Sequence, residues 1–306
     1  MAIEIISIDG SATSTTSASN PKKISTNPLN PLSRPTRTLL STTLQKAIED
    51  DAITSIVLHG GKNFSAGADI SEFGTPEPES TTPIPSITEL CDQIESSPKP
   101  IIALITGFAL GGGCELALAC HYRIAVEGAK IGLPEVKIGL IPGAGGTQRL
   151  TRLCRDVGWA LEVITSGRTI TATEAKTKHL IDHLIPHTPS ATNPTSSPLP
   201  TAQKWATYAT LLSDLTHRRT RNRNVLLPTD PTALSTANAV CDHYLQKRIP
   251  PKARGGQAAH AAVEAIRASF REGSTFEEGM EVEAEYFWDL LLNGVQGRAL
   301  RYAFFA

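Results

Sequence analysis

The stretch IIALITGFALGGGCEL, residues 101–116, decides the fold. It opens with the mainly apolar run Ile101–Thr106, which is typical of a strand buried on both faces of a parallel sheet. Glycines at 107 and 111–113 end this run and let the backbone turn tightly and approach a ligand closely. The segment Cys114–Cys120 follows as the expected helix. A strand, a glycine turn and a helix in this order predict an α/β domain.

The sequence on either side repeats this order. Leu39–Asp51 has apolar residues at three- and four-residue spacing and predicts an amphipathic helix. The β-branched run Ile53–His59, ended by two glycines, predicts a second buried strand. Shorter expected elements are a strand at Met1–Asp9, turns or loops at Gly10–Ser19 and Pro76–Pro85, a helix at Ile87–Ser96 and a strand at Arg123–Val126. The repetition indicates mostly parallel pairing.

The composition changes at residues 190–200, which are dense in Pro, Ser and Thr. Helical periodicity follows, and two sets of residues are each predicted to share one helix face: Ala259, Val263, Ile266 and Phe270, and further on Met280, Ala284, Phe287 and Leu291. We therefore expect an α/β core over residues 1–189, a variable helical or linker segment over 190–253 and a helical region over 254–306.

Composition excludes several classes of protein. The 306 residues are 40% hydrophobic, which suffices for a sizeable core, and 29 Lys and Arg nearly balance 30 Asp and Glu. This balance indicates neither a nucleic-acid partner nor a membrane-surface partner. The basic run at residues 217–223 is a local exception, interpreted as a solvated linker or a patch salt-bridged to the domain.

The five cysteines lie at no metal-ligand spacing, and no CxxC occurs. We expect free, mostly buried thiols, a reducing intracellular compartment and no metal site. The start of the chain lacks the features of a signal peptide. No apolar run reaches the roughly 18 residues of a membrane span.

Three segments could carry chemistry: KNFSAGADI at 62–70, GFALGGGCEL at 107–116 and LPEVKIGLIPGAGGTQRL at 133–150. Turns at Gly67 and at the triple glycine could each contribute one N–H, the minimum for an oxyanion hole. Neither the P-loop pattern GxxxxGK[ST] nor the dinucleotide pattern GxGxxG is present, so both nucleotide interpretations are set aside.

Two glutamates in these segments are candidate acid/base groups. Glu115 lies in the first turn of the expected helix, where a carboxylate is equally well explained by the helix dipole. Glu135 follows a proline amid apolar residues, which would raise its pKa, although a lone acid there is more often structural. The presence of all three segments in this order favours the catalytic interpretation of both.

These segments resemble the crotonase (enoyl-CoA hydratase/isomerase) family. The matching motifs are AGAD at 66–69, GGGCEL at 111–116, PE at 134–135, IPGAGGTQRL at 141–150, and TSGR at 165–168 with EA at 174–175. The resemblance covers roughly residues 27–186. It implies a spiral of ββα units, with the site between two turns of the spiral and a mostly helical C-terminal region after it.

The resemblance also implies roles. The backbone N–H groups of Ala68 and Gly112 would form the oxyanion hole for a thioester. Glu115 and Glu135 would add water across the double bond of a trans-2-enoyl-CoA to give a 3-hydroxyacyl-CoA. The expected substrate and CoA contacts are Ala66, Gly67, Asp69, Ile70 and Gly111. No separate cofactor is implied, because coenzyme A enters as part of the substrate.

The region 254–306 resembles the stretch that joins the hydratase part of multifunctional β-oxidation proteins to a 3-hydroxyacyl-CoA dehydrogenase part. The matching pieces are GGQAA at 255–259, FEEGMEVEAEYF at 276–287 and GRALRYAFFA at 297–306. The chain is therefore expected to be the hydratase half of such a protein, without the dehydrogenase domain. The expected location is the peroxisome for a eukaryotic source and the cytoplasm for a bacterial one. Acyl-chain length and oligomeric state stay open.

The sequence departs from the family at three places. Residues 11–20 look inserted, residues 186–251 match weakly, and His179 stands where a glycine is usual, which predicts an altered turn there. Two alternative functions remain: Δ3-Δ2-enoyl-CoA isomerisation, which needs a base at Glu135 but no Glu115, and a crotonase-fold module without catalysis.

Overall fold

A computed structural model describes residues 2–8, 12–14, 27–73, 83–186, 197–211, 214–227, 232–252, 255–295 and 297–300. Most of the expected loop at 76–85, most of the polar stretch at 10–19 and the apolar terminus at 301–306 lie outside these residues.

The main sheet is six-stranded, in the order β11-β8-β6-β4-β1-β2. Its strands are β1 Ala2–Ser7, β2 Ala12–Ser14, β4 Ile53–His59, β6 Ile101–Ile105, β8 Tyr122–Val126 and β11 His183–Ile185. All neighbouring pairs are parallel except β1 with β2. The predicted strands at 53–59, 101–106 and 123–126 are confirmed within one residue at each end, whereas β2 falls in a stretch expected to be a turn.

Two smaller sheets lie beside the main sheet. One has the order β10-β9-β7, with β7 Phe108–Leu110, β9 Lys130–Gly132 and β10 Thr169–Thr171; the other pairs β3 Pro31–Leu32 with β5 Gly67–Ala68. Each turn of the chain therefore places one strand in the main sheet, a second in a small sheet, and then a helix. The sets β4-β5-α2, β6-β7-α3 and β8-β9-α4 follow this pattern, so the predicted ββα spiral is confirmed.

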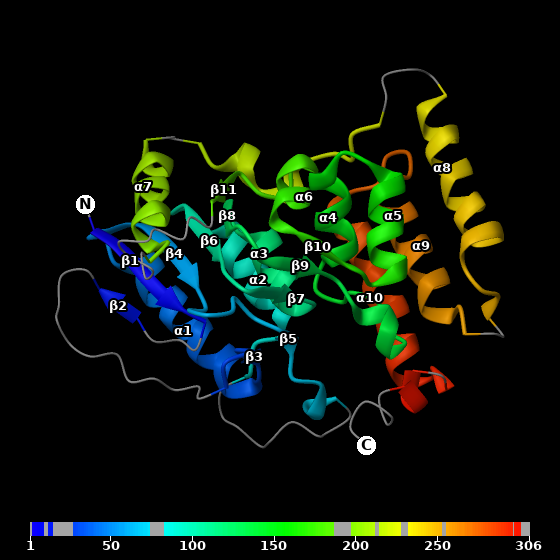
Figure 1. Cartoon of the computed structure of the whole chain (residues 1–306), viewed down its shortest axis with the longest axis horizontal. Coiled ribbons are helices and arrows are strands. Elements are labelled where there is room, and N and C mark those ends of the chain that lie inside the picture. Colours follow the sequence, from blue (N-terminus) through cyan, green and yellow to red (C-terminus); the bar gives the residue numbers. More distant parts are fainter. Residues whose placement is uncertain are drawn as a thin grey trace.

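Helices cover the main sheet (Figure 1). The α-helices are α1 Arg34–Glu49, α2 Ile87–Ser96, α3 Gly112–Ala119, α4 Gly146–Cys154, α5 Val157–Ser166, α6 Ala172–Thr177, α7 Leu199–Thr210, α8 Ala233–His243, α9 Gln257–Ala268 and α10 Phe276–Leu292. The prediction for α2 is confirmed at both ends. Helix α1 begins five residues before the predicted Leu39, because Pro35 is favourable in a first helical turn.

The predicted helical C-terminal region is confirmed, and it packs onto the core. Helix α9 packs against both α5 and α10, and α10 also contacts α4. Val263, Ile266 and Phe270 are buried as expected. The four residues predicted to share a face of α10 are half-buried, and Phe287 and Leu291 among them pack against the core. The fully buried residues of this helix lie beside them: Phe276, Gly279, Glu283 and Leu290.

The left-handed backbone of His179, with a φ of 61°, explains why the family uses glycine there. Its turn closes with a hydrogen bond from the Leu180 N–H to the Ala175 carbonyl, 2.9 Å long. His179 therefore takes a backbone conformation that ordinarily favours glycine, and the alteration of the turn relative to the family stays a prediction.

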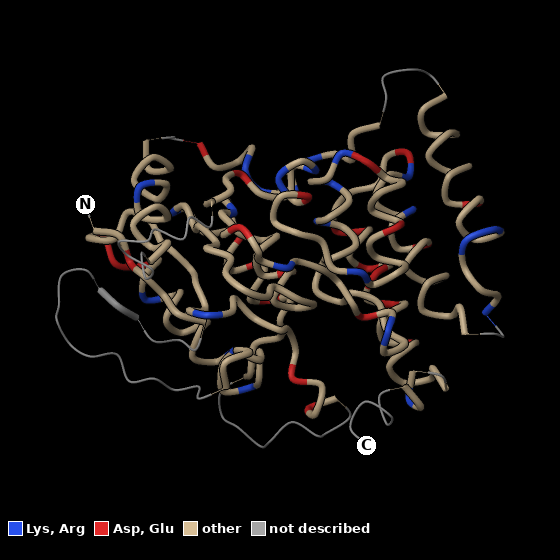
Figure 2. The backbone as a smooth tube through the Cα atoms, viewed as in Figure 1, with Lys and Arg blue, Asp and Glu red and all other residues tan. Residues whose placement is uncertain are grey.

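Basic and acidic residues are interspersed along the chain, as Figure 2 shows. The basic run is salt-bridged to the domain, since Arg218 pairs with Asp182 and Arg221 pairs with both Asp92 and Glu95. All five cysteines are free and buried, as predicted. Within the described ranges, no helix is both long enough and apolar enough to cross a bilayer.

Candidate active site

Glu115 lies in the first turn of α3, which begins directly after the glycine turn. Its side chain is 3% exposed. Its Oε1 accepts two backbone N–H groups, from Ala144 at 2.7 Å and from Gly146 at 2.8 Å. Burial raises the pKa of this carboxyl, and the two N–H donors oppose the rise. The alternative role as a simple helix-start group does not account for a carboxylate that reaches a loop 29 residues further along the chain.

Glu135 opens a short 3-10 helix, η2 Glu135–Ile138, directly after β9 and Pro134. The residue is partly buried, but its Oε2 is fully buried and has no hydrogen-bond partner among the described residues. Burial raises its pKa well above the ordinary range, and the charge of Glu115 raises it further. A raised pKa favours the protonated form of this carboxyl and suits it to donate a proton.

Both glutamates lie close to the glycine turn. A Cβ atom built on Gly111 would lie 3.0 Å from Glu135 Oε1, and the backbone N–H of Glu115 donates to the Gly111 carbonyl at 3.0 Å. The two carboxylates are near enough that the charge of Glu115 raises the pKa of Glu135. Gly111 has a φ of 51° and a ψ of −129°, a conformation that residues with a side chain avoid. The absence of a Cβ there leaves the Glu135 carboxylate room beside the turn.

The expected oxyanion-hole residues also approach each other. A Cβ on Gly112 would lie 3.4 Å from the Ala68 nitrogen, and one on Gly67 would lie 3.0 Å from the Gly112 nitrogen. Gly112 is the first residue of α3, so its N–H has no partner within the helix. The two backbone turns thus bring Ala68 and Gly112 together, as the sequence predicted, although their role stays a prediction.

The expected substrate contacts fall in the same neighbourhood. Ala66 donates its N–H to the Leu29 carbonyl at 2.8 Å, and Gly67 forms part of β5. Asp69 caps the 3-10 helix η1 Ile70–Glu72 by accepting from the Ser71 N–H at 3.1 Å. Ala66, Asp69 and Ile70 are all partly exposed and therefore accessible to a ligand.

A third buried acid was missed by the sequence reasoning. Glu283 of α10 is 0% exposed and accepts from the Gly145 N–H at 2.6 Å and from the Thr147 N–H at 2.8 Å. Burial and then the charge of Glu115 raise its pKa to about 8. The spacing of Phe276, Gly279, Glu283 and Leu290 along one helix face was the available signal, but a glutamate on such a face is ordinarily expected to be exposed.

Arg149 supplies positive charge beside the loop that holds Glu115. Its guanidinium is 0% exposed, pairs with Glu95 at 2.9 Å and donates to the Ala144 carbonyl at 2.8 Å. It therefore supports the same loop whose N–H groups hold Glu115.

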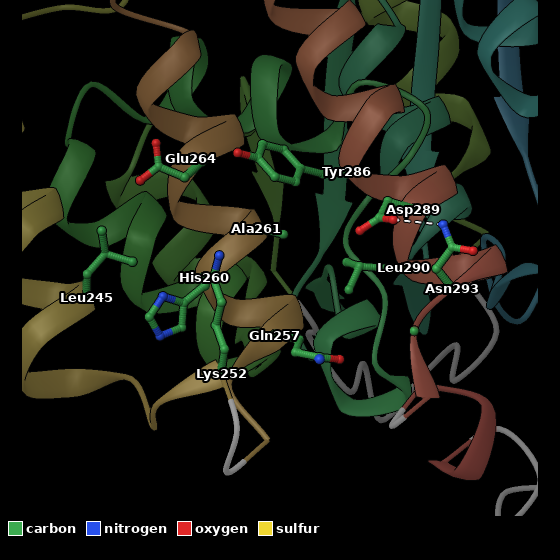
Figure 3. A pocket seen from close by; sticks show the side chains of 11 residues that line it. Leu245, Lys252, Gln257, His260, Ala261, Glu264, Tyr286, Asp289, Leu290 and Asn293 are labelled. Atoms are coloured by element: carbon green, nitrogen blue, oxygen red, sulfur yellow. Dashed lines mark hydrogen bonds between the residues drawn. The ribbon is translucent and has the colours of Figure 1, made fainter.

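A separate cavity of about 370 Å³ lies between α9 and α10 (Figure 3). The lining residues are Leu245, Lys252, Gln257, His260, Ala261, Glu264, Tyr286, Asp289, Leu290, Asn293 and Gly294. None of them is a candidate site residue, so this cavity is not the candidate active site. Among the residues that the structure describes, no cluster of three or more His, Cys, Asp or Glu side chains is arranged to hold a metal ion.

Known proteins share both the sequence and the fold. Residues 23–227 match the family described as "Enoyl-CoA hydratase/isomerase". The "Peroxisomal bifunctional enzyme" of Danio rerio is 38% identical over 280 residues, covering 91% of this chain and 35% of that protein. The "Probable enoyl-CoA hydratase" of Bacillus subtilis (strain 168) is 50% identical over 151 residues, covering 48% of this chain and 58% of that protein.

A solved structure shows the same fold. It is an enoyl-CoA hydratase/isomerase from Pseudoalteromonas atlantica T6c, with a TM-score of 0.59 and 21% identity, covering 90% of this chain and 88% of that one. The chain spans about a third of the length of the first curated relatives it matches, 35% and 33%.

Proposed function

This chain belongs to the enoyl-CoA hydratase/isomerase family, and we propose that it adds water to trans-2-enoyl-CoA to give 3-hydroxyacyl-CoA in fatty-acid β-oxidation. The observation that carries the proposal is the pair of acids Glu115 and Glu135, which lie close to the Gly111 turn, interact electrostatically and have raised pKa values. Hydration needs one group that takes a proton and one that gives a proton, and these two carboxyls are placed to share the task.

The reaction begins with polarisation of the thioester. The N–H groups of Ala68 and Gly112 donate hydrogen bonds to the thioester oxygen and stabilise the negative charge that develops on it. The polarised carbonyl withdraws electron density from the conjugated double bond and so makes C3 of the acyl chain electrophilic. The loop 66–70 contacts the CoA portion from the accessible side of the site.

Water then adds in two proton transfers. Glu115 takes a proton from the water as its oxygen bonds to C3, and Glu135 delivers a proton to C2, so the double bond becomes a single bond. The N–H groups of Ala144 and Gly146 both bond Glu115 Oε1, which fixes the direction in which the carboxylate faces the water. The unpartnered Oε2 of Glu135 is the oxygen suited to carry the delivered proton.

The test is the loss of absorbance of the conjugated thioester when the purified chain is mixed with crotonyl-CoA. The product is identified by adding a 3-hydroxyacyl-CoA dehydrogenase and NAD⁺ and following NADH. We expect hydration by the wild-type chain and by Glu272→Gln, an exposed control. No absorbance change at high protein concentration would contradict the proposal and favour a module without catalysis.

Isomerisation is the second candidate, because the unpartnered buried oxygen of Glu135 could also move a proton between C4 and C2. Glu115→Gln separates the two reactions. Its amide oxygen can still accept both loop N–H groups, so the variant should fold, lose hydration and spare any isomerisation of a 3-enoyl-CoA. Equal loss of both activities, or of neither, would contradict the separate roles.

The chain is further proposed to be the hydratase part of a longer protein whose 3-hydroxyacyl-CoA dehydrogenase part takes up the product. Support comes from relatives named bifunctional enzymes that are about three times as long. The proposed location in a eukaryotic source is the peroxisome, which the names of these relatives support. Immunoblotting of fractionated source cells tests both statements, and a band of only this chain's 32.7 kDa outside the peroxisomal fraction would contradict them.

A further inference from the structure

Two acids from distant parts of the chain bind one short loop. The loop Ala144–Thr147 leads into α4, and its four successive N–H groups alternate between two carboxylates. Ala144 and Gly146 donate to Glu115 at 2.7 and 2.8 Å, whereas Gly145 and Thr147 donate to Glu283 at 2.6 and 2.8 Å. The loop that orients Glu115 is therefore the same four-residue loop that Glu283 anchors.

The contact between Glu283 and the loop is strengthened by the Thr147 side chain. Its hydroxyl lies 2.5 Å from Glu283 Oε2 and accepts from Gln148 Nε2 at 2.9 Å. A hydroxyl can donate to a carboxylate or accept from a carboxylic acid, so this contact persists in either protonation state of Glu283.

The rest of α10 is docked so that Glu283 is held in place. Phe276 packs against the guanidinium groups of Arg149 and Arg152, with their carbons 5.1 Å from the ring centre. A Cβ on Gly279 would lie 2.0 Å from Gln148 Oε1, so only glycine allows this close approach. One turn beyond Glu283, Phe287 occupies the space beside Gly143, where a Cβ would lie 2.6 Å from its ring.

We propose that Glu283 is a positioning residue for hydration: through the loop Ala144–Thr147, it fixes the carboxylate of Glu115 that acts on water. The inference rests on the proposed function. It makes α10 part of the hydratase site, although this helix lies outside the 23–227 region that matches the family. Glu283 itself touches neither water nor substrate in this account, and it acts only through the loop.

The test uses two variants of Glu283 and one control on the same helix. Glu283→Ala removes every contact with the loop, Glu283→Gln keeps the side-chain volume and one acceptor, and Glu281→Gln changes an exposed acid two residues away. A displacement of a catalytic group by about 1 Å can lower the rate 100-fold. We expect kcat with crotonyl-CoA to fall about 10- to 100-fold in Glu283→Ala, less in Glu283→Gln, and less than twofold in Glu281→Gln.

Two readouts separate positioning from a general structural role. KM should change less than about threefold in both Glu283 variants, because the thioester and CoA contacts lie on other elements. Hydrogen exchange of residues 144–147 should speed up in the same order as kcat falls. An unchanged kcat, or a rise in KM alone, would overturn the inference. If Glu283→Ala does not fold, Glu283→Gln decides by the same criteria.

The outcomes also separate this inference from the proposed function. A wild-type chain that hydrates crotonyl-CoA while Glu283→Gln retains full kcat and unchanged exchange overturns the role of Glu283 alone. A wild-type chain that does not hydrate overturns the proposed function, and the inference falls with it.

Discussion

Substitution of Gly112 by alanine should impair the oxyanion hole without impairing folding. Gly112 is the first residue of α3 and has no positive φ, so alanine introduces no backbone strain. The added Cβ would lie 3.4 Å from the Ala68 nitrogen. A methyl group at that place competes with a thioester oxygen, which must approach the same N–H to about 2.9 Å.

The expected effect on the rate is large, and the effect on stability is small. Loss of one oxyanion donor lowers kcat by about 10²- to 10³-fold, or roughly 3–4 kcal/mol of transition-state stabilisation. The closest other contact is Ile87 Cδ1 at 2.8 Å, the end of a flexible side chain that can move aside. Alanine also favours a helix over glycine by up to about 1 kcal/mol. We therefore expect a Tm close to that of the wild-type chain.

The assay compares hydration of crotonyl-CoA and thermal unfolding in Gly112→Ala and Gly158→Ala. Gly158 lies in the first turn of α5, where a Cβ would meet nothing closer than 3.5 Å. The control should keep full activity and a wild-type or slightly higher Tm. A Gly112→Ala chain that folds and hydrates crotonyl-CoA within threefold of the wild-type rate would refute the assignment of the Ala68 N–H to the oxyanion hole.

Three further predictions follow from single positions. Gly111→Ala and Gly128→Ala both place a side chain at positive φ, of 51° and 93°, and each should lower the free energy of unfolding in urea by about 1–3 kcal/mol. Only Gly111→Ala should also lower kcat, because its Cβ would lie 3.0 Å from Glu135 Oε1. Equal kcat values in the two variants would contradict the site geometry. His179→Gly relieves a φ of 61° and should raise the free energy of unfolding by about 1 kcal/mol, and a decrease in the same urea titration would contradict this. The pKa of Glu283 is raised from 4.5 to about 8, so its contribution to stability is present below the lower value and lost as the pH rises through the upper one. The fall in Tm between about pH 5 and about pH 8 should therefore be smaller in Glu283→Gln than in the wild-type chain. An equal fall in both would contradict the pKa shift.

The sequence was most informative where burial is continuous. The run Ile53–His59 forms β4 with the predicted ends, because its β-branched and apolar residues suit a strand that is covered on both faces. Helix α2 was equally well predicted, since Ser86 and Glu89 cap it reciprocally. Glu115 and Glu135 became persuasive as a pair only through the order of the motifs around them.

Long-range contacts account for what the sequence did not show. Glu283 meets Gly145 from 138 residues away, and no local pattern encodes that distance. Apolar periodicity favoured the face of α10 with Met280 and Phe287. The packing of Phe276 on arginines and the fit of Gly279 to Gln148 extend the buried face of the helix beyond these residues, and the glutamate lies on the extended part.

The most direct test of the central claim is the single-turnover rate of crotonyl-CoA hydration in Glu115→Gln, Glu135→Gln and the double variant. Groups that act as a unit on one water show strongly non-additive losses. The account predicts that each single variant loses at least about 100-fold at unchanged Tm and that the double variant is little slower than the slower single one. Losses that multiply in the double variant, or a single variant with near wild-type rate, would contradict it.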